Sequence, residues 1–196
     1  MGRGLGPAAV GLLVAAMLAG CGSPAGASGP TGAAPSAPAV HNVLQACPAQ
    51  PDRPAAGAKT LPKLRLSCPG GGTLDLGRAP GVPTVVNLWG SWCGPCREEL
   101  PIMQQLADTA GGRVRVVGVI SKDGLPQAES FAADAKVTFP SAFDGQGDLM
   151  TGVGINVLPY SYFLDADGAL VYTQVGPVSS LDQLRALVAE HLRVQL

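Results

Sequence analysis

The stretch that decides the fold is GSWCGPCREELP, residues 90–101, in which Cys93 and Cys96 enclose a Gly-Pro pair. It follows PTVVNLW (residues 83–89), a β-branched apolar run typical of a strand that is covered on both faces. Pro95 is tolerated in a first helical turn, because its missing N–H has no partner there. The sequence therefore predicts a buried strand that ends just before Cys93 and a helix over residues 93–109, with Pro101 inside it.

The two cysteines of this stretch are compatible with a zinc site, a structural bridge or a redox centre. A structural zinc ion needs four ligands, and downstream of Cys96 only His191 is available, while Cys47 and Cys68 stand singly. A copper-delivering site is disfavoured as well, since the spacing is CxxC and no histidine lies between Cys96 and His191. A disulfide across four residues removes little chain entropy, so a purely structural bridge gains little. The redox interpretation is favoured.

The position of the pair supports redox chemistry. At a helix N-terminus, free N–H groups and the helix dipole favour an anion, so we expect a lowered pKa for the Cys93 thiol. Cys96, one turn further on, is expected to face inward. An exposed nucleophile and a sheltered resolving thiol are what exchange through a mixed disulfide requires.

The motif WCGPC, residues 92–96, resembles that of the thioredoxin superfamily, and VVNLWGSWCGPCREELP is similar to its TlpA/ResA-like branch of membrane-anchored, extracytoplasmic thiol-disulfide oxidoreductases. GINVLP (residues 154–159), DADG (165–168) and Val175-Gly176 before the last helix match in the same order. The resemblance covers residues 61–196. It implies an α/β thioredoxin-like fold: a central mixed sheet flanked by helices, with an N-terminal β-hairpin and a central inserted helix and strand.

The resemblance also implies the parts of a substrate-binding site. Pro159 corresponds to the family's cis-proline, which faces the cysteine pair, and Leu158 would present its backbone to an extended segment that binds as an added strand. Trp92, with Gly94 and Pro95 beside it, is expected to form part of the docking surface. No cofactor and no metal are expected.

Glu99 is the candidate acid–base group. Thioredoxins proper keep a buried aspartate six positions before the first cysteine, whereas this chain has Asn87 there, which cannot titrate. The resemblance suggests that Glu99, three residues beyond Cys96 on the same helix face, exchanges a proton with that resolving thiol. The alternative is an ordinary solvated carboxylate, as assumed for Glu98.

Hydrophobic patterning predicts the remaining elements. Residues 63–66 and 73–76 alternate around a triple glycine and predict a hairpin. Further strands are expected at residues 113–120, 160–164 and 170–174, and a short strand or extended piece at residues 137–139, with a turn-rich stretch after it. Helices are expected at residues 127–135 and 180–194, and Ser180 and Gln183 form a capping box at the start of the last one. The order strand, helix, strand, then hairpin and helix describes a two-layer α/β protein with a mixed sheet.

Cys47 and Cys68 precede the first core strand. A bridge between them would close a loop of about 22 residues, worth roughly 3 kcal/mol in the chain-entropy model. We expect a structural disulfide that ties the Pro-rich segment to the hairpin. A second redox pair acting as a relay is the alternative.

The N-terminus resembles a bacterial lipoprotein signal over residues 1–20. Residues 5–19 are apolar but too short to span a bilayer, and Leu18-Ala19-Gly20-Cys21 matches a lipobox, in which Cys21 is lipidated after cleavage. An ordinary secretory signal with a chance cysteine is the alternative. Residues 21–40 then form a tether rich in Gly, Ala, Pro and Ser, and residues 41–60 an N-terminal extension before the domain at 61–196. This organisation predicts anchoring at the outer face of the cell membrane.

The charge composition argues against nucleic acid as a binding partner. The 196-residue chain has a formal charge of −1, without the basic footprint of a nucleic-acid-binding protein. The expected partners are extracytoplasmic proteins with cysteines. A reductant would act on substrates such as apocytochrome c and take electrons from a CcdA/DsbD-like membrane protein, and the Gly-Pro dipeptide leans this way. An oxidant of secreted proteins and a non-catalytic binding module remain alternatives.

Overall fold

The central strand β3 (Thr84–Trp89) is buried along its whole length, as its apolar run predicts. In the computed structural model, which describes residues 42–196, it lies parallel to β4 (Arg115–Ser121) and antiparallel to β6 (Tyr160–Leu164). At the sheet edges, β5 (Ser141–Asp144) pairs in parallel with β4, and β7 (Leu170–Val175) pairs antiparallel with β6. The order β5-β4-β3-β6-β7 is the predicted mixed sheet of a thioredoxin-like fold.

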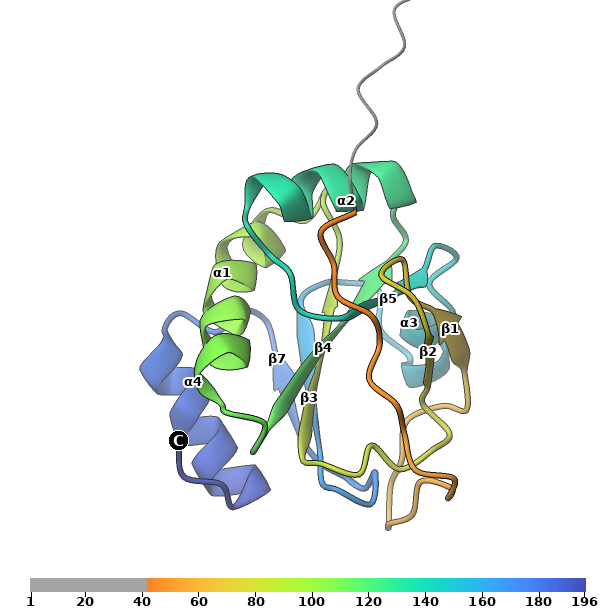
Figure 1. Ribbon diagram of the computed structural model, residues 1–196, viewed down its shortest axis with the longest axis vertical. Helices are drawn as coiled ribbons and strands as arrows, with labels where there is room; N and C mark the ends of the chain where they lie inside the picture. The colour runs from red at the N-terminus through yellow and green to blue at the C-terminus, as the bar shows by residue number, and fades with distance from the viewer. Residues whose placement is uncertain (1–41) are drawn as a thin grey trace, which may run out of the picture. The chain divides into compact units, whose positions relative to one another are not determined.

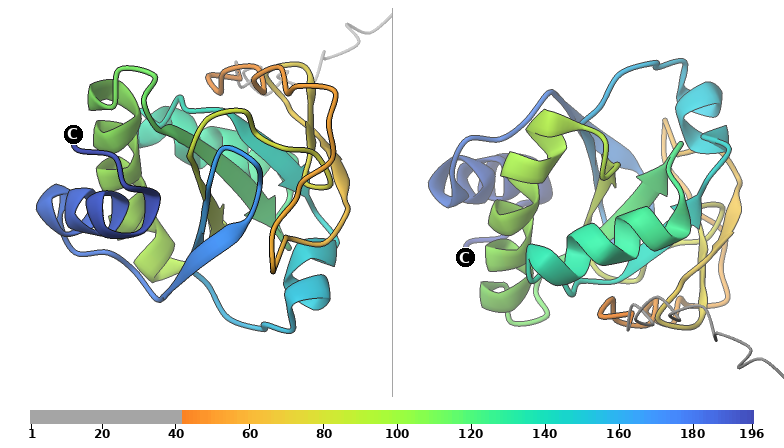
Figure 2. Two further views of the ribbon diagram at one scale, coloured as in Figure 1. Left: turned by 90° about the horizontal axis from the view of Figure 1, so that it is seen from below. Right: turned by 90° about the horizontal axis from the view of Figure 1, so that it is seen from above.

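Helices and a small hairpin cover the two faces of this sheet (Figures 1 and 2). Helix α1 (Gly94–Thr109) and helix α4 (Leu181–Leu187), which continues as the π-helix η1 (Val188–Leu192), pack on one face. The other face carries α3 (Asp148–Val153) and the hairpin of β1 (Arg65–Ser67) and β2 (Thr73–Asp75). Helix α2 (Leu125–Asp134) crosses the end of the sheet where the β3–α1 connection lies.

The segment at 42–60 runs along the outside of the domain and is held to it at several points. Leu44 is buried in the same hydrophobic cluster as α1. The backbone N–H of Gln45 donates to the carbonyl of Thr138 at 2.9 Å, and that of Ala56 donates to Asp167 in the β6–β7 turn at 2.9 Å. The extension therefore contributes to the core instead of only preceding it.

Of the two alternatives for residues 137–139, the short strand is wrong, since the strand in this region is β5, which begins at Ser141. Val137 and Phe139 are buried, which explains the apolar pattern. However, the N–H groups of Thr138 and Phe139 both donate to the side-chain oxygen of Gln104 on α1, at 2.7 and 3.1 Å. Backbone groups that are satisfied by a helix side chain need no neighbouring strand.

Two helical segments also differ from expectation. Helix α3 lies within the stretch that the sequence predicts to be turn-rich. A left-handed glycine bounds it at each end, and two of its N–H groups donate to the Asp144 carboxylate. The last helix begins after Ser180, whose hydroxyl caps it as predicted, but it widens to η1 at Val188. It ends at Arg193, which has a φ of 60°.

The predicted signal, the lipidation site at Cys21 and the tether lie outside the described residues. Within residues 42–196, no helix is both long enough and apolar enough to cross a membrane.

Candidate active site

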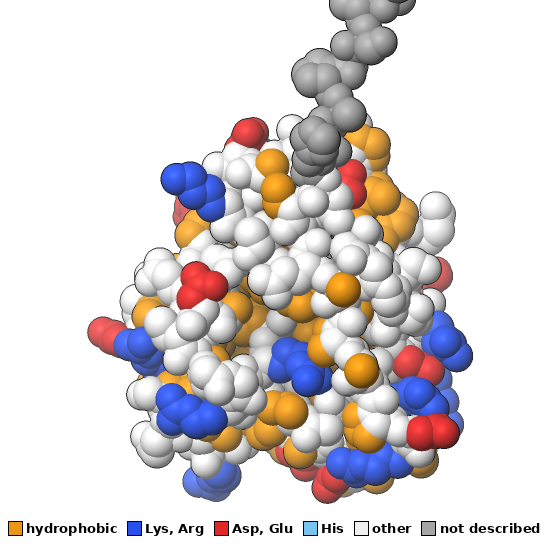
Figure 3. Space-filling view, viewed as in Figure 1, with side chains coloured by type: hydrophobic (Ala, Val, Ile, Leu, Met, Phe, Trp, Pro, Cys, Tyr) orange, Lys and Arg blue, Asp and Glu red, His pale blue; other side chains and the backbone are white. Residues whose placement is uncertain are grey.

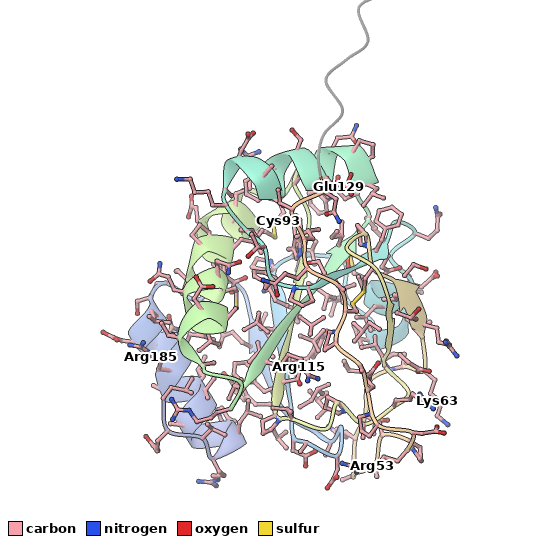
Figure 4. The ribbon with its side chains drawn as sticks, viewed as in Figure 1. Arg53, Lys63, Cys93, Arg115, Glu129 and Arg185 are labelled. Atoms are coloured by element: carbon pink, nitrogen blue, oxygen red, sulfur yellow. A yellow bond between two sulfur atoms is a disulfide. The ribbon has the colours of Figure 1, made fainter. Side chains whose placement is uncertain are left out.

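The two cysteines of the CGPC segment lie at the junction between β3 and α1, and we call them the redox pair. Cys93 is the N-cap residue of α1, and its Sγ accepts a hydrogen bond from the backbone N–H of Cys96 at 3.2 Å. The two sulfur atoms form a disulfide, with the Cα atoms 5.3 Å apart. Figure 4 shows Cys93 at the α2 end of α1. A sulfur in this position receives the helix N–H groups that stabilise a thiolate.

In the disulfide form, Cys93 is much less exposed than the sequence predicts for the nucleophile. Cys93 is 4% exposed and Cys96 is fully buried, so the asymmetry has the predicted direction but a small size. Both cysteines belong to the hydrophobic cluster that also contains Trp89 and Leu100. The exposed neighbour is Trp92, with 55% of its surface accessible.

The Leu158–Pro159 bond is cis, as the family resemblance implies. Pro159 directly precedes β6, whose first residue, Tyr160, pairs with Leu88 near the end of β3. Because β3 and β6 are antiparallel, β6 begins beside the carboxyl end of β3. The redox pair follows β3 at this same end of the sheet. The N–H of Gly176, just after β7, donates to the carbonyl of Pro159 at 3.1 Å and brings a third segment to this edge.

A connection that the sequence did not reveal holds the loop before Cys93. The indole N–H of Trp92 donates to the carbonyl of Lys122 at 2.9 Å. The side chain of Asp123 accepts hydrogen bonds from the backbone N–H of Ser91 at 2.5 Å and from its hydroxyl at 3.1 Å. Lys122 and Asp123 lie about thirty positions further along the chain and belong to no motif, so only the parallel pairing of β3 with β4 brings them to this loop.

Glu99 is not the solvated carboxylate that was the alternative, because its side chain is completely buried. Its Oε2 accepts a hydrogen bond from the Nδ2 of Asn87 on β3 at 2.8 Å. Its Oε1 accepts one from the backbone N–H of Val178, after β7, at 3.0 Å. Asn87 Nδ2 also donates to the hydroxyl of Ser161 on β6, at 3.0 Å. Glu99 therefore sits in a polar cluster inside the core, one helical turn beyond Cys96.

Burial raises the pKa of Glu99 above its ordinary value, because the charged form loses its hydration. The hydrogen bonds from Val178 and Asn87 act in the opposite direction and are the weaker effect. A carboxyl group whose pKa is raised towards neutrality is suited to exchanging protons near physiological pH.

Three segments of the rim are apolar and uncharged, whereas Arg97, Lys122 and Asp123 border Ser91 and Trp92. Trp92, Val157 and Val175 are large hydrophobic residues that are 55, 56 and 62% exposed. The three segments that carry them, residues 88–96, 149–164 and 168–181, contain no charged side chain. Elsewhere the surface is mixed, and Figure 3 shows positive and negative side chains interspersed on one face.

The comparisons with known proteins decide the family. The model of the family described as Redoxin matches residues 55–188, more than half of the chain. The chain belongs to the Redoxin family. The match contains the redox pair, Glu99 and Pro159, and the family assignment confirms the thioredoxin-like character that the motifs indicate.

Named relatives of this Redoxin chain point to one activity. Sporulation thiol-disulfide oxidoreductase A of Bacillus subtilis is 33% identical over 114 residues, which are 56% of this chain and 68% of that protein. Other curated relatives, which include proteins named ResA and DsbE, match over 58 to 76% of their own length. The chain is thus a thiol-disulfide oxidoreductase similar to the TlpA/ResA-like branch.

Solved structures agree with this Redoxin assignment. DsbF of Mycobacterium tuberculosis superimposes with a TM-score of 0.60 at 26% identity, covering 67% of this chain and 98% of that one. The exposed lipoprotein thioredoxin Etrx1 of Streptococcus pneumoniae superimposes with a TM-score of 0.57 at 25% identity, covering 65% and 98%.

Proposed function

We propose that this protein is an extracytoplasmic, lipid-anchored oxidoreductase that reduces selected disulfides with the dithiol of Cys93 and Cys96. The observation that carries the proposal is the position of Cys93 Sγ as the N-cap of α1, where it accepts the N–H of Cys96. This geometry favours the Cys93 thiolate as the nucleophile. The more deeply buried Cys96 is the resolving thiol.

In the reducing direction, the redox pair passes two electrons to the substrate disulfide in two attacks. The Cys93 thiolate attacks one sulfur of the substrate disulfide, and the other substrate sulfur leaves as a thiolate. The thiol of Cys96 then loses its proton to the Glu99 carboxylate and attacks Sγ of Cys93. The second substrate sulfur leaves, the Cys93–Cys96 disulfide forms, and two electrons have passed to the substrate.

The substrate binds as an extended segment beside the cis-peptide bond. Leu158 precedes that bond at the sheet edge of the redox pair, and its backbone can pair with a strand laid along it. Trp92 directly precedes Cys93 and is exposed, and Gly94 and Pro95 lie between the two cysteines. Because the segments that carry Trp92, Val157 and Val175 hold no charged side chain, we expect apolar contact with these three residues to contribute to the choice of partner.

The direction of electron flow is tested by trapping. Cys96→Ser leaves a mixed disulfide on Cys93 that cannot be resolved, so the partners accumulate and can be identified by mass spectrometry. Apocytochrome c or a CcdA/DsbD-like membrane protein among them would support the reductant. A broad set of unrelated secreted proteins would instead support an oxidant that introduces disulfides.

Lipidation of Cys21 places the domain outside the cytoplasm in this proposal. The lipobox-like LAGC at residues 18–21 supports it, as does the similarity to a protein named as an exposed lipoprotein. Cys21→Ala is expected to release the protein from the membrane fraction. A protein that stays in that fraction after this substitution would contradict the anchor.

Glu99→Gln is expected to slow exchange by about 10²-fold at neutral pH, because it removes the group that accepts the Cys96 proton. The same variant tests the raised pKa through stability. The native state binds the Glu99 proton more tightly than the unfolded state does, so the wild type loses stability as pH rises from about 4.5 to the native pKa. The glutamine variant lacks this loss. Unchanged exchange kinetics and an unchanged pH profile of urea unfolding would remove Glu99 from the mechanism.

Cys47 and Cys68 form a disulfide in the structure, with both side chains largely buried. We propose that this bridge is structural and holds the N-terminal extension against β1. Replacing both cysteines by alanine is expected to lower the free energy of unfolding by about 3 kcal/mol while exchange continues. Alkylation during mild reduction, followed by mass spectrometry, compares how readily the two disulfides open. A Cys47–Cys68 bridge that opens as readily as Cys93–Cys96 would indicate a relay instead.

A further inference from the structure

Asn87 has an unusual hydrogen-bonding imbalance for a fully buried amide. Its Nδ2 donates twice, to Glu99 Oε2 at 2.8 Å and to Ser161 Oγ at 3.0 Å. Its Oδ1 is buried and accepts no hydrogen bond. A buried polar atom without a partner costs free energy, so its presence inside the core calls for a reason.

The chemistry of the two partners supplies that reason. A carboxylate only accepts hydrogen bonds, whereas a carboxylic acid has one O–H to donate. An amide can meet either state by turning over, because its nitrogen donates and its oxygen accepts. A serine hydroxyl can also do both. In this protein the carboxyl group that Asn87 contacts is Glu99, which lies one helical turn beyond Cys96 on α1 and must gain and lose a proton if it serves Cys96.

We propose that Asn87 and Ser161 are positioning residues that keep Glu99 hydrogen-bonded in both of its protonation states. With Glu99 as a carboxylate, Asn87 Nδ2 donates to Glu99 and to Ser161, as the structure shows. When Glu99 receives the proton of the Cys96 thiol, the amide turns over. Its Oδ1 then accepts the O–H of Glu99 and the O–H of Ser161, and no proton leaves the cluster.

The surroundings of Glu99 make it the group that titrates in this cluster. Its hydrogen bonds come from two neutral groups, the Nδ2 of Asn87 on β3 and the N–H of Val178, and the further partner of Asn87, Ser161 of β6, is neutral as well. On α1 itself, Arg97 and Glu98 are exposed, so the titratable group of the buried face nearest to Glu99 is the redox cysteine Cys96. Further along the same face of β6, His191 of η1 packs against Phe163. On α4, Arg185 reaches Thr109 at the opposite end of α1.

The same hydrogen bonds connect Glu99, through Asn87 and Ser161, to the strand that follows the cis-peptide bond. Asn87 and Ser161 are directly opposite each other in the β3–β6 ladder, and Ser161 lies two residues after Pro159. The cis-peptide bond therefore directly precedes β6, and the second residue of that strand, Ser161, accepts a hydrogen bond from the side chain of Asn87. The inference rests on the proposed function, because it assigns these residues to the proton step of that exchange.

Asn87→Leu removes the donor to the Glu99 carboxylate at similar volume, so the ionised form of Glu99 becomes less favourable. We expect the pH midpoint of disulfide exchange with a small peptide disulfide to move upward by about 1 unit, the value of one charge-assisted hydrogen bond. Ser161→Ala should move it in the same direction by less. Ser141→Ala, a buried serine on β5, is the matched control and should move nothing. Thermal melting identifies any variant that does not fold.

Two further measurements separate the possible outcomes. In a Glu99→Gln background, adding Asn87→Leu should not move the pH midpoint of disulfide exchange any further. A midpoint that still moves in this double variant would overturn the proposal. An unchanged midpoint in the Asn87→Leu single variant would overturn it as well. Infrared difference spectra between low and high pH should show the side-chain amide carbonyl band moving together with protonation of Glu99, and an unmoved band would exclude the turnover of the amide. If the wild type exchanges no disulfide at all, the proposed function itself fails, which is a different result from exchange with an unaltered pH profile.

Discussion

Cys93→Ala is expected to reduce disulfide exchange to the uncatalysed background, a loss of roughly 10³-fold or more, because the remaining thiol, Cys96, is fully buried and cannot reach a substrate disulfide. The side chain that replaces the sulfur also leaves the N–H of Cys96 without the acceptor that caps α1. The reduction of a model disulfide, followed by the fluorescence or absorbance of the released thiol, measures the effect directly.

The control for this prediction separates catalysis from folding. Cys96→Ser should retain attack by Cys93 and stop at the mixed disulfide, so one equivalent of substrate thiol is released and turnover ends. Both variants should keep a cooperative unfolding transition, since the core strands and α1 are unchanged. Substantial multiple turnover by Cys93→Ala would contradict the role assigned to Cys93.

Leu106→Ala is expected to lower the free energy of unfolding by about 2–5 kcal/mol, the usual cost of a cavity at a fully buried leucine. Leu106 lies on α1 more than two turns beyond the redox pair, and its side chain is completely buried in the cluster between α1 and the sheet. Urea unfolding followed by circular dichroism measures the loss. The rate of disulfide exchange under native conditions should stay close to that of the wild type.

The matched control is its neighbour on the same helix. Gln105 is exposed, and Gln105→Ala should change the free energy of unfolding by less than about 0.5 kcal/mol. Equal effects of the two substitutions would mean that the buried face of α1 does not carry the stability. A Leu106→Ala variant that is stable but inactive would place Leu106 in the site, contrary to the structure.

Local patterns predicted the elements that are strongly apolar or carry a motif. The strand at 160–164 and the capping of the last helix by Ser180 agree with the structure. The boundaries failed where a side chain substituted for a strand partner, as Gln104 does for residues 138 and 139. Helix α3 was missed because its six residues are bounded by glycines that read as turns. Such contacts act across the fold and leave no periodic signal in the local sequence.

The sequence by itself determined the chemistry of this protein. A CxxC at the predicted start of a helix, with Gly-Pro between the cysteines, favours thiol exchange over a zinc site, because the sequence offers no second pair of closely spaced ligands. The family motifs added the candidates Glu99 and Pro159.

Only the tertiary structure decided how those residues are arranged. It buries Glu99 and surrounds it with Asn87, Ser161 and Val178, which come from three separate segments. It also clamps the loop before Cys93 to Asp123. Strand pairing sets these distances, so residues far apart in the chain meet only when the sheet has formed. The pKa of Glu99 depends on that burial, which no local stretch of sequence contains.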